Sequence, residues 1–87
     1  QLTENKAALL HYRDMDVNVH PGETVRYIVT DEKASNYRDK VKVEGEEISD
    51  YDTRFYQRYL FRVLEEILIP FGYDGEDIKR KVTRLNR

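Results

Sequence analysis

Alternating apolar and polar residues in the first half of the chain predict two β-strands. In residues 24–30, Val25, Tyr27 and Val29 fall on one side of an extended segment, and Thr24, Arg26 and Ile28 fall on the other. Residues 40–43 repeat the alternation, with valines on one side and lysines on the other. The polar residues between the two runs suit a turn, so the pattern predicts an antiparallel hairpin.

A wide apolar stripe in the second half predicts a long amphipathic helix over residues 53–69. Its apolar residues recur at helical spacing: Phe55, Tyr56, Tyr59, Leu60, Val63, Leu64, Ile67 and Leu68. Asp52 stands where an N-cap is expected, and Pro70 with Gly72 ends the pattern. Shorter helices are expected over residues 5–14, capped by Thr3 or Asn5, and over residues 76–85.

These elements predict an α+β fold in which a small hairpin or sheet packs against the long helix, with shorter N- and C-terminal helices. A chain of 87 residues is expected to form a single domain, 1–87. It has no cysteine, which excludes disulfides and a thiolate zinc site. No stretch approaches the roughly 18 consecutive apolar residues of a membrane span, and no signal peptide is expected. We therefore expect a soluble interior protein.

The net charge of −2 conceals two halves of opposite sign. Residues 1–52 contain 12 acidic and 7 basic side chains, a balance of −5, whereas residues 53–87 contain 5 acidic and 8 basic ones, a balance of +3. Only charges near the phosphates contribute strongly to nucleic-acid binding. A nucleic-acid partner would therefore have to meet local basic patches.

Two groups of basic residues form such patches. The first belongs to the hairpin and comprises Arg26, Arg38, Lys40 and Lys42, of which Lys40 and Lys42 are expected on the solvent face of their strand. The second, near the C-terminus, comprises Lys79, Arg80 and Lys81. Either phosphate contact or pairing with nearby acids explains the hairpin group, and the residues alone leave both open. Arg54, Arg58 and Arg62 recur every four residues, and pairing of Arg62 with Glu65 or Glu66 is favoured there.

The sequence offers no constellation of catalytic or metal-binding residues. Asp14-x-Asp16-x-Asn18 begins like a calcium loop, but valine stands at the sixth and twelfth positions, where glycine and glutamate are needed. His11 and His20 have no evident carboxylate or nucleophile neighbour in the sequence. No catalytic residue, cofactor or metal site is therefore predicted in this chain.

Five short motifs in order resemble the thumb of archaeal-type family B DNA polymerases. They are Pro21-Gly22, Tyr27-Ile28-Val29, Asp39-Lys40 in place of Asp-Arg, Tyr51-Asp52-x-x-Phe55-Tyr56 and Phe71-Gly72-Tyr73. The resemblance extends over residues 17–77. Residues 1–16 align poorly with the family, and lysine in place of arginine loses the planar fork that binds phosphate bidentately.

The resemblance implies a thumb-like part of a DNA-directed DNA polymerase, a nucleotidyltransferase of DNA replication that would use Mg²⁺ in its palm domain. Such a thumb grips the primer–template duplex through phosphates and the minor groove without catalysing nucleotide transfer. The implied DNA-binding residues are Arg26, Arg38, Lys40 and Lys42, followed by Lys79, Arg80 and Lys81. The implied location is cytoplasmic and associated with the nucleoid.

A different function class also fits the residues. The chain could be a protein-interaction module, or a split polymerase subunit, that docks on the palm domain of a partner polymerase chain. Phe61 and Ile69 lie off the main apolar stripe, and their exposure would favour this alternative.

Overall fold

The structure, a computed structural model, describes residues 2–85, with side chains through Lys81. The chain divides into two units, residues 1–51 and residues 52–87, which we call the N-terminal and C-terminal units. Helices and strands occur together, so the α+β class is confirmed. The expectation of a single domain, 1–87, stays a prediction, and each unit is described by itself.

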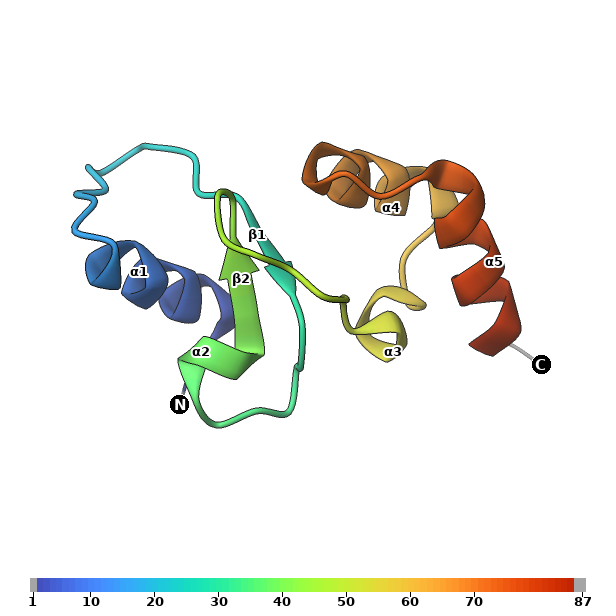
Figure 1. Ribbon diagram of the computed structural model, residues 1–87, viewed down its shortest axis with the longest axis horizontal. Coiled ribbons are helices and arrows are strands. Elements are labelled where there is room, and N and C mark those ends of the chain that lie inside the picture. The colour runs from blue at the N-terminus through green and yellow to red at the C-terminus, as the bar shows by residue number, and fades with distance from the viewer. Residues whose placement is uncertain (1, 86–87) are drawn as a thin grey trace. The chain divides into compact units, whose positions relative to one another are not determined.

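The N-terminal unit is a two-stranded antiparallel sheet with one main helix on it (Figure 1). Its elements are α1 (Glu4–Asp14), β1 (Tyr27–Val29), the single-turn α2 (Tyr37–Lys40) and β2 (Val41–Val43). The hairpin predicted from the alternation is thus confirmed, although both strands are shorter than expected. The sheet pairs Tyr27 with Val43, Ile28 with Lys42 and Val29 with Val41.

Helix α1 packs on the sheet through its smallest side chains. Thr3 caps the helix by accepting a hydrogen bond from the Lys6 backbone N–H at 3.1 Å, which confirms one of the two expected caps. Ala7 and Ala8 are fully buried, and so is Val41 on the sheet. Short alanine side chains let the helix approach the strands closely, and this contact forms the core of the unit.

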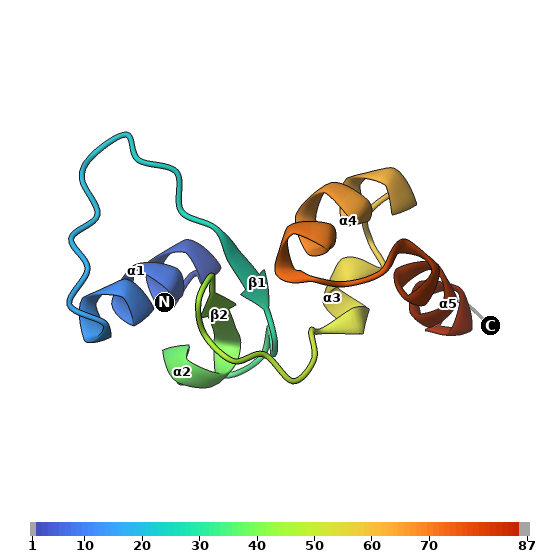
Figure 2. The same ribbon diagram turned by 45° about the horizontal axis from the view of Figure 1, so that its top comes forward.

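The C-terminal unit is entirely helical. It contains α3 (Thr53–Tyr56), α4 (Phe61–Leu68), the short 3₁₀ helix η1 (Ile69–Phe71) and α5 (Gly75–Leu85). Helix α5 contacts both α3 and α4 (Figure 2). The core of the unit includes the fully buried side chains of Leu64, Leu68 and Ile78.

The prediction of a single long helix over residues 53–69 is wrong, because the segment is divided into α3 and α4. The break lies at Leu60, whose backbone is extended (φ −67°, ψ 145°). A straight helix of this length would extend about 25 Å, whereas the 11 residues of α5 extend about 16 Å. Two short segments can both contact α5, but one straight rod would leave part of its apolar stripe beyond the end of α5.

The ends of the helical segments follow the sequence signals. Asp52 caps α3 through a hydrogen bond that its Oδ1 accepts from the Phe55 backbone N–H at 3.0 Å. At the other end, Gly72 adopts the left-handed conformation (φ 95°) that glycine tolerates best. The predicted start and stop of the segment are therefore confirmed, although its middle is not continuous.

Candidate nucleic-acid interface

Lys40, predicted to contact phosphate from a solvent-facing position, is buried, with 7% of its surface exposed. Its Nζ donates hydrogen bonds to the carbonyl oxygens of Glu32 and Ala34, the latter at 3.4 Å. The Nζ also lies 3.9 Å from Glu4 Oε2. The expected solvent-facing position is wrong because Lys40 ends α2, so the strand alternation begins one residue later, at Val41.

Arg26 immediately precedes β1, and Lys42 is the middle residue of β2. Lys42 is paired in register with Ile28 and is half-buried. Two residues before Ile28, Arg26 Nη1 lies 3.9 Å from Glu44 Oε2, and both side chains are about three-fifths exposed. A surface pair of this kind contributes about 0–1 kcal/mol, so a phosphate can compete with Glu44 for the guanidinium. Lys42 forms no ion pair with any residue that the structure describes.

Arg38 belongs to an exposed cluster around Asp14 at the end of α1. Its Nη2 lies 3.8 Å from Asp14 Oδ2, and its guanidinium stacks 4.7 Å above the centre of the Tyr37 ring. The Tyr37 hydroxyl donates a hydrogen bond to the same carboxylate, and Arg13 Nη2 donates another at 3.3 Å. The cluster ties α2 to α1, so Arg38 has a structural partner as well as an exposed face.

This cluster predicts a loss of stability in acid. The pKa of Asp14 is lowered, chiefly by the Tyr37 hydrogen bond; desolvation, the next largest effect, opposes this, and Arg13 and Arg38 lower the pKa further. A lowered carboxyl pKa stabilises the fold at pH values above the ordinary aspartate pKa, and this contribution disappears as pH falls through the folded-state pKa. Wild type should therefore be more stable than Asp14→Asn at neutral pH, and the difference should vanish in strong acid.

Denaturant unfolding of wild type and of Asp14→Asn, measured from neutral pH down to strong acid, checks the prediction. Asp16→Asn is a suitable control, because Asp16 lies two residues away and is exposed. A difference between wild type and Asp14→Asn that stays constant down to strong acid would show that the ionised carboxylate of Asp14 does not hold the cluster.

The second predicted group lies on α5, where two of its cations share one carboxylate. Arg80 Nη2 donates to Asp77 Oδ1 at 2.5 Å, and Lys81 Nζ lies 3.8 Å from Asp77 Oδ2. Lys79 is exposed and forms no ion pair with a described residue. Asp77 lies in the first turn of α5 and the cations follow it, which also suits the dipole of the helix. Of this group, Lys79 is the cation most available to an external anion.

The arginines around the break between α3 and α4 are more available to an external anion than the helical spacing predicts. Arg54 and Arg62 are exposed, and neither forms an ion pair with a described residue. In particular, Arg62 does not pair with Glu65 or Glu66, although the helical spacing favours it. Arg58 donates from Nε to the Phe55 carbonyl oxygen at 3.3 Å and stacks on the ring of that residue.

His11 is a buried polar residue whose role the sequence does not reveal. It is 4% exposed, and its Nδ1 lies 3.0 Å from Glu46 Oε2. Its Nε2 lies 2.8 Å from the Tyr37 carbonyl oxygen, and Glu46 Oε1 accepts the Val43 backbone N–H. The expectation that His11 lacks a carboxylate neighbour is wrong, because Glu46 comes from 35 residues further along the chain. Both ring nitrogens are used in joining α1, α2 and the turn after β2.

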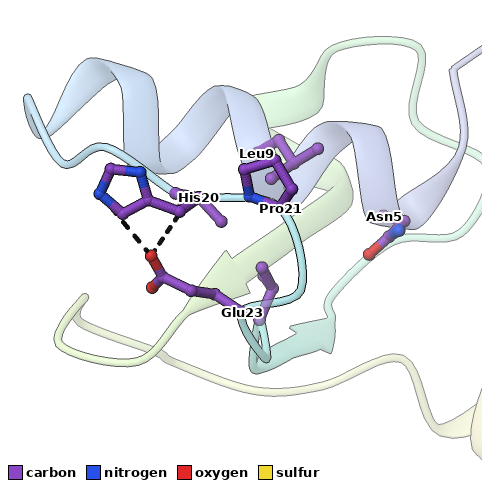
Figure 3. Close-up of a pocket in the computed structure, with 7 residues that line it drawn as sticks. Asn5, Leu9, His20, Pro21 and Glu23 are labelled. Atoms are coloured by element: carbon purple, nitrogen blue, oxygen red, sulfur yellow. Dashed lines mark hydrogen bonds and ion pairs between the residues drawn. The ribbon is translucent and has the colours of Figure 1, made fainter.

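An open groove of about 340 Å³ lies between α1 and residues 19–25 (Figure 3). Leu9 and Pro21 give it an apolar floor, and Asn5 lies at one end. At the other end, the His20 backbone N–H donates to Glu23 Oε1 at 2.9 Å. The groove contains neither of the predicted cation groups, and it brings no nucleophile and base together.

Within residues 2–85, no three histidine, aspartate or glutamate side chains gather in a way that could hold a metal ion. None of the helices described for this chain is both long enough and apolar enough to cross a lipid bilayer.

Comparisons with known proteins add no relative to these observations. No protein-family model matches the chain. Searches of curated proteins and of solved structures also found no match.

Proposed function

We propose that this chain is a thumb-like part of a DNA polymerase of the archaeal family B type, which grips the primer–template duplex through its phosphates. The observation that supports this best is the accessibility of the cations. Six of the seven predicted DNA-binding residues are exposed or half-buried: Arg26, Arg38, Lys42, Lys79, Arg80 and Lys81. The seventh, Lys40, is buried and takes no part in the proposed contact.

The energetics of the exposed ion pairs are compatible with such a grip. Arg26 and Arg38 each lie close to 4 Å from a carboxylate, in pairs with more than a third of each side chain exposed. Such pairs are worth about 0–1 kcal/mol. Phosphate contacts also gain from the release of condensed counterions, so duplex DNA can replace the carboxylates. Lys42 and Lys79 form no ion pair with a described residue, so a phosphate that binds them displaces no carboxylate.

Contacts of this kind position a duplex and do not read its sequence. The polymerase chemistry, with its Mg²⁺ ions, would belong to a palm domain outside these 87 residues. The palm domain and duplex DNA are then the proposed partners, and the nucleoid is the proposed location. We propose no catalytic role for any residue of this chain.

The test is a titration of the protein with primer–template duplex at about 50 and about 200 mM salt, which separates electrostatic from other contacts. Wild type should bind at the lower salt and weaken steeply at the higher one. In Lys42→Glu/Lys79→Glu, the slope of log affinity against log salt should fall by about two counterions, one for each lost contact. Both side chains lack ion pairs with described residues, so their replacement should leave the fold intact.

A matched control changes the net charge equally at other positions. Lys6→Glu/Lys33→Glu replaces two exposed lysines on α1 and in the turn before α2. It should leave the salt slope close to that of wild type. Absence of binding at low salt, or an equal effect of both double variants, would contradict the proposed phosphate contacts.

One observation favours the alternative function as well. Phe61 and Ile69 are 38% and 47% exposed, which is the condition under which docking on a partner chain is expected. Protein docking and DNA gripping use different residues, so the two functions do not exclude each other.

A further inference from the structure

We infer that the C-terminal unit docks a protein segment that carries apolar side chains next to carboxylates, at the junction between α3 and α4. The inference rests on the docking alternative and is independent of DNA binding. We call this area the junction surface, and it comprises Arg54, Arg58, Tyr59, Leu60, Phe61 and Arg62.

Three consecutive side chains of the junction surface expose apolar area. Tyr59, Leu60 and Phe61 are 40%, 72% and 38% exposed, and Leu60 has the largest exposed fraction of the big apolar side chains that the structure describes. Single exposed apolar residues are normal on proteins, whereas neighbouring exposed ones can together form an interaction site. The break in the helix creates this exposure, because it turns Leu60 off the stripe that buries Leu64.

The helix itself gains nothing from a leucine at this position. Leu60 is the N-cap of α4, where it makes no side-chain hydrogen bond to the exposed backbone N–H groups. Serine, threonine, aspartate or asparagine is strongly preferred at an N-cap, and leucine is among the poorest choices. Neither the cap nor the core of the unit requires this leucine, so a binding role explains it better than a folding role.

The charges around the apolar residues indicate what the partner carries. Arg54 and Arg62 flank them without an ion pair to any described residue. The first turns of α3 and α4 contain no acidic residue. A partner with carboxylates on both sides of its apolar side chains would complement this arrangement, and a basic partner would be repelled.

A protein segment suits the junction surface better than a nucleic acid does. Nucleic-acid strands are held by cations and by aromatic rings on which bases stack. The junction surface holds three arginines and the exposed rings of Tyr59 and Phe61, but its most exposed residue, Leu60, offers neither a hydrogen bond nor a stacking face. Protein interfaces, in contrast, combine aromatic and arginine anchors with apolar contact at their centre.

The test measures the binding of a short fluorescein-labelled peptide that alternates glutamate with leucine and phenylalanine, using fluorescence anisotropy and the full chain. The glutamate peptide should bind saturably, and its lysine counterpart should not. Leu60→Ser should weaken binding at least about tenfold, a loss of about 1.4 kcal/mol. The same substitution should raise the melting temperature or leave it unchanged, because serine can accept the Val63 backbone N–H.

Val17→Ser is the matched control. Val17 is 47% exposed but lies in the N-terminal unit, so its replacement should not alter peptide binding. Three results would overturn the inference: no binding of the glutamate peptide, equal binding of the lysine peptide, or unchanged affinity in Leu60→Ser. Failure of duplex DNA to displace the peptide from wild type would leave the inference intact and place DNA on a separate surface. Displacement of the peptide by duplex DNA, together with weaker direct binding of DNA to Leu60→Ser, would instead make the junction surface a nucleic-acid site and overturn the inference.

Discussion

Replacing Lys40 with glutamate is expected to destabilise the N-terminal unit by about 3–5 kcal/mol, the usual effect of leaving a buried charge without its partner. The wild-type ammonium donates to two backbone carbonyls and lies near Glu4. A carboxylate at the same place would face acceptors only, and it would repel Glu4. Urea unfolding, followed by amide hydrogen exchange in α1 and the two strands, measures the loss.

Two comparisons make this prediction specific. Lys40→Met keeps an unbranched apolar stem but removes the hydrogen bonds to the carbonyls of Glu32 and Ala34, so it should cost about 1–3 kcal/mol. Lys33→Glu changes an exposed lysine and should stay within about 0.5 kcal/mol of wild type. If Lys40→Glu were as stable as wild type, the Lys40 side chain would not be buried as described. The result also matters for DNA binding, since a loss of affinity in Lys40→Glu would report unfolding and not a missing phosphate contact.

Leu64→Ala should destabilise the C-terminal unit by about 2–5 kcal/mol, whereas Leu60→Ala should change its stability by less than about 0.5 kcal/mol. Leu64 is fully buried, and Leu60 is 72% exposed. Truncating a buried leucine removes its apolar contacts and leaves a cavity, but truncating an exposed one does neither. The unfolding free energy of the two variants, measured under the same conditions, gives the comparison.

This pair of substitutions also tests the division of the segment into α3 and α4. The two leucines are four residues apart, so one continuous helix would place them on the same face. In that case both truncations would cost similar amounts. Equal losses would therefore contradict the break at Leu60, and a large difference would support it.

The sequence predicts those features that depend on neighbouring residues. The caps at Thr3 and Asp52 require only a short polar side chain ahead of a helical stretch, and both are confirmed. The hairpin follows from a period-two alternation, and its pairing is antiparallel as expected. The buried Leu64 follows from helical spacing in the same way.

Features that depend on distant residues could not be predicted in this way. The break at Leu60 has neither glycine nor proline to signal it, and it depends on the contacts that α3 and α4 each make with α5. His11 meets Glu46 only after the hairpin has formed. Lys40 was assigned to a solvent face by alternation, although the residue belongs to the turn of helix before the strand. For the candidate site, the sequence located the cations, but the structure was needed to tell the buried one from the accessible ones.

The bond between His11 and Glu46 also bears on the order in which the chain can assemble. It closes a loop across 35 residues, whereas α3, α4 and α5 follow one another through short turns. Closing a longer loop costs more chain entropy, and folds rich in local contacts form faster. During synthesis, the N-terminal unit emerges first, but the bond between His11 and Glu46 cannot form until residue 46 has left the ribosome. Helix α1 is therefore synthesised before the strands that cover Ala7 and Ala8. In the C-terminal unit, the contacting helices follow one another closely in the sequence.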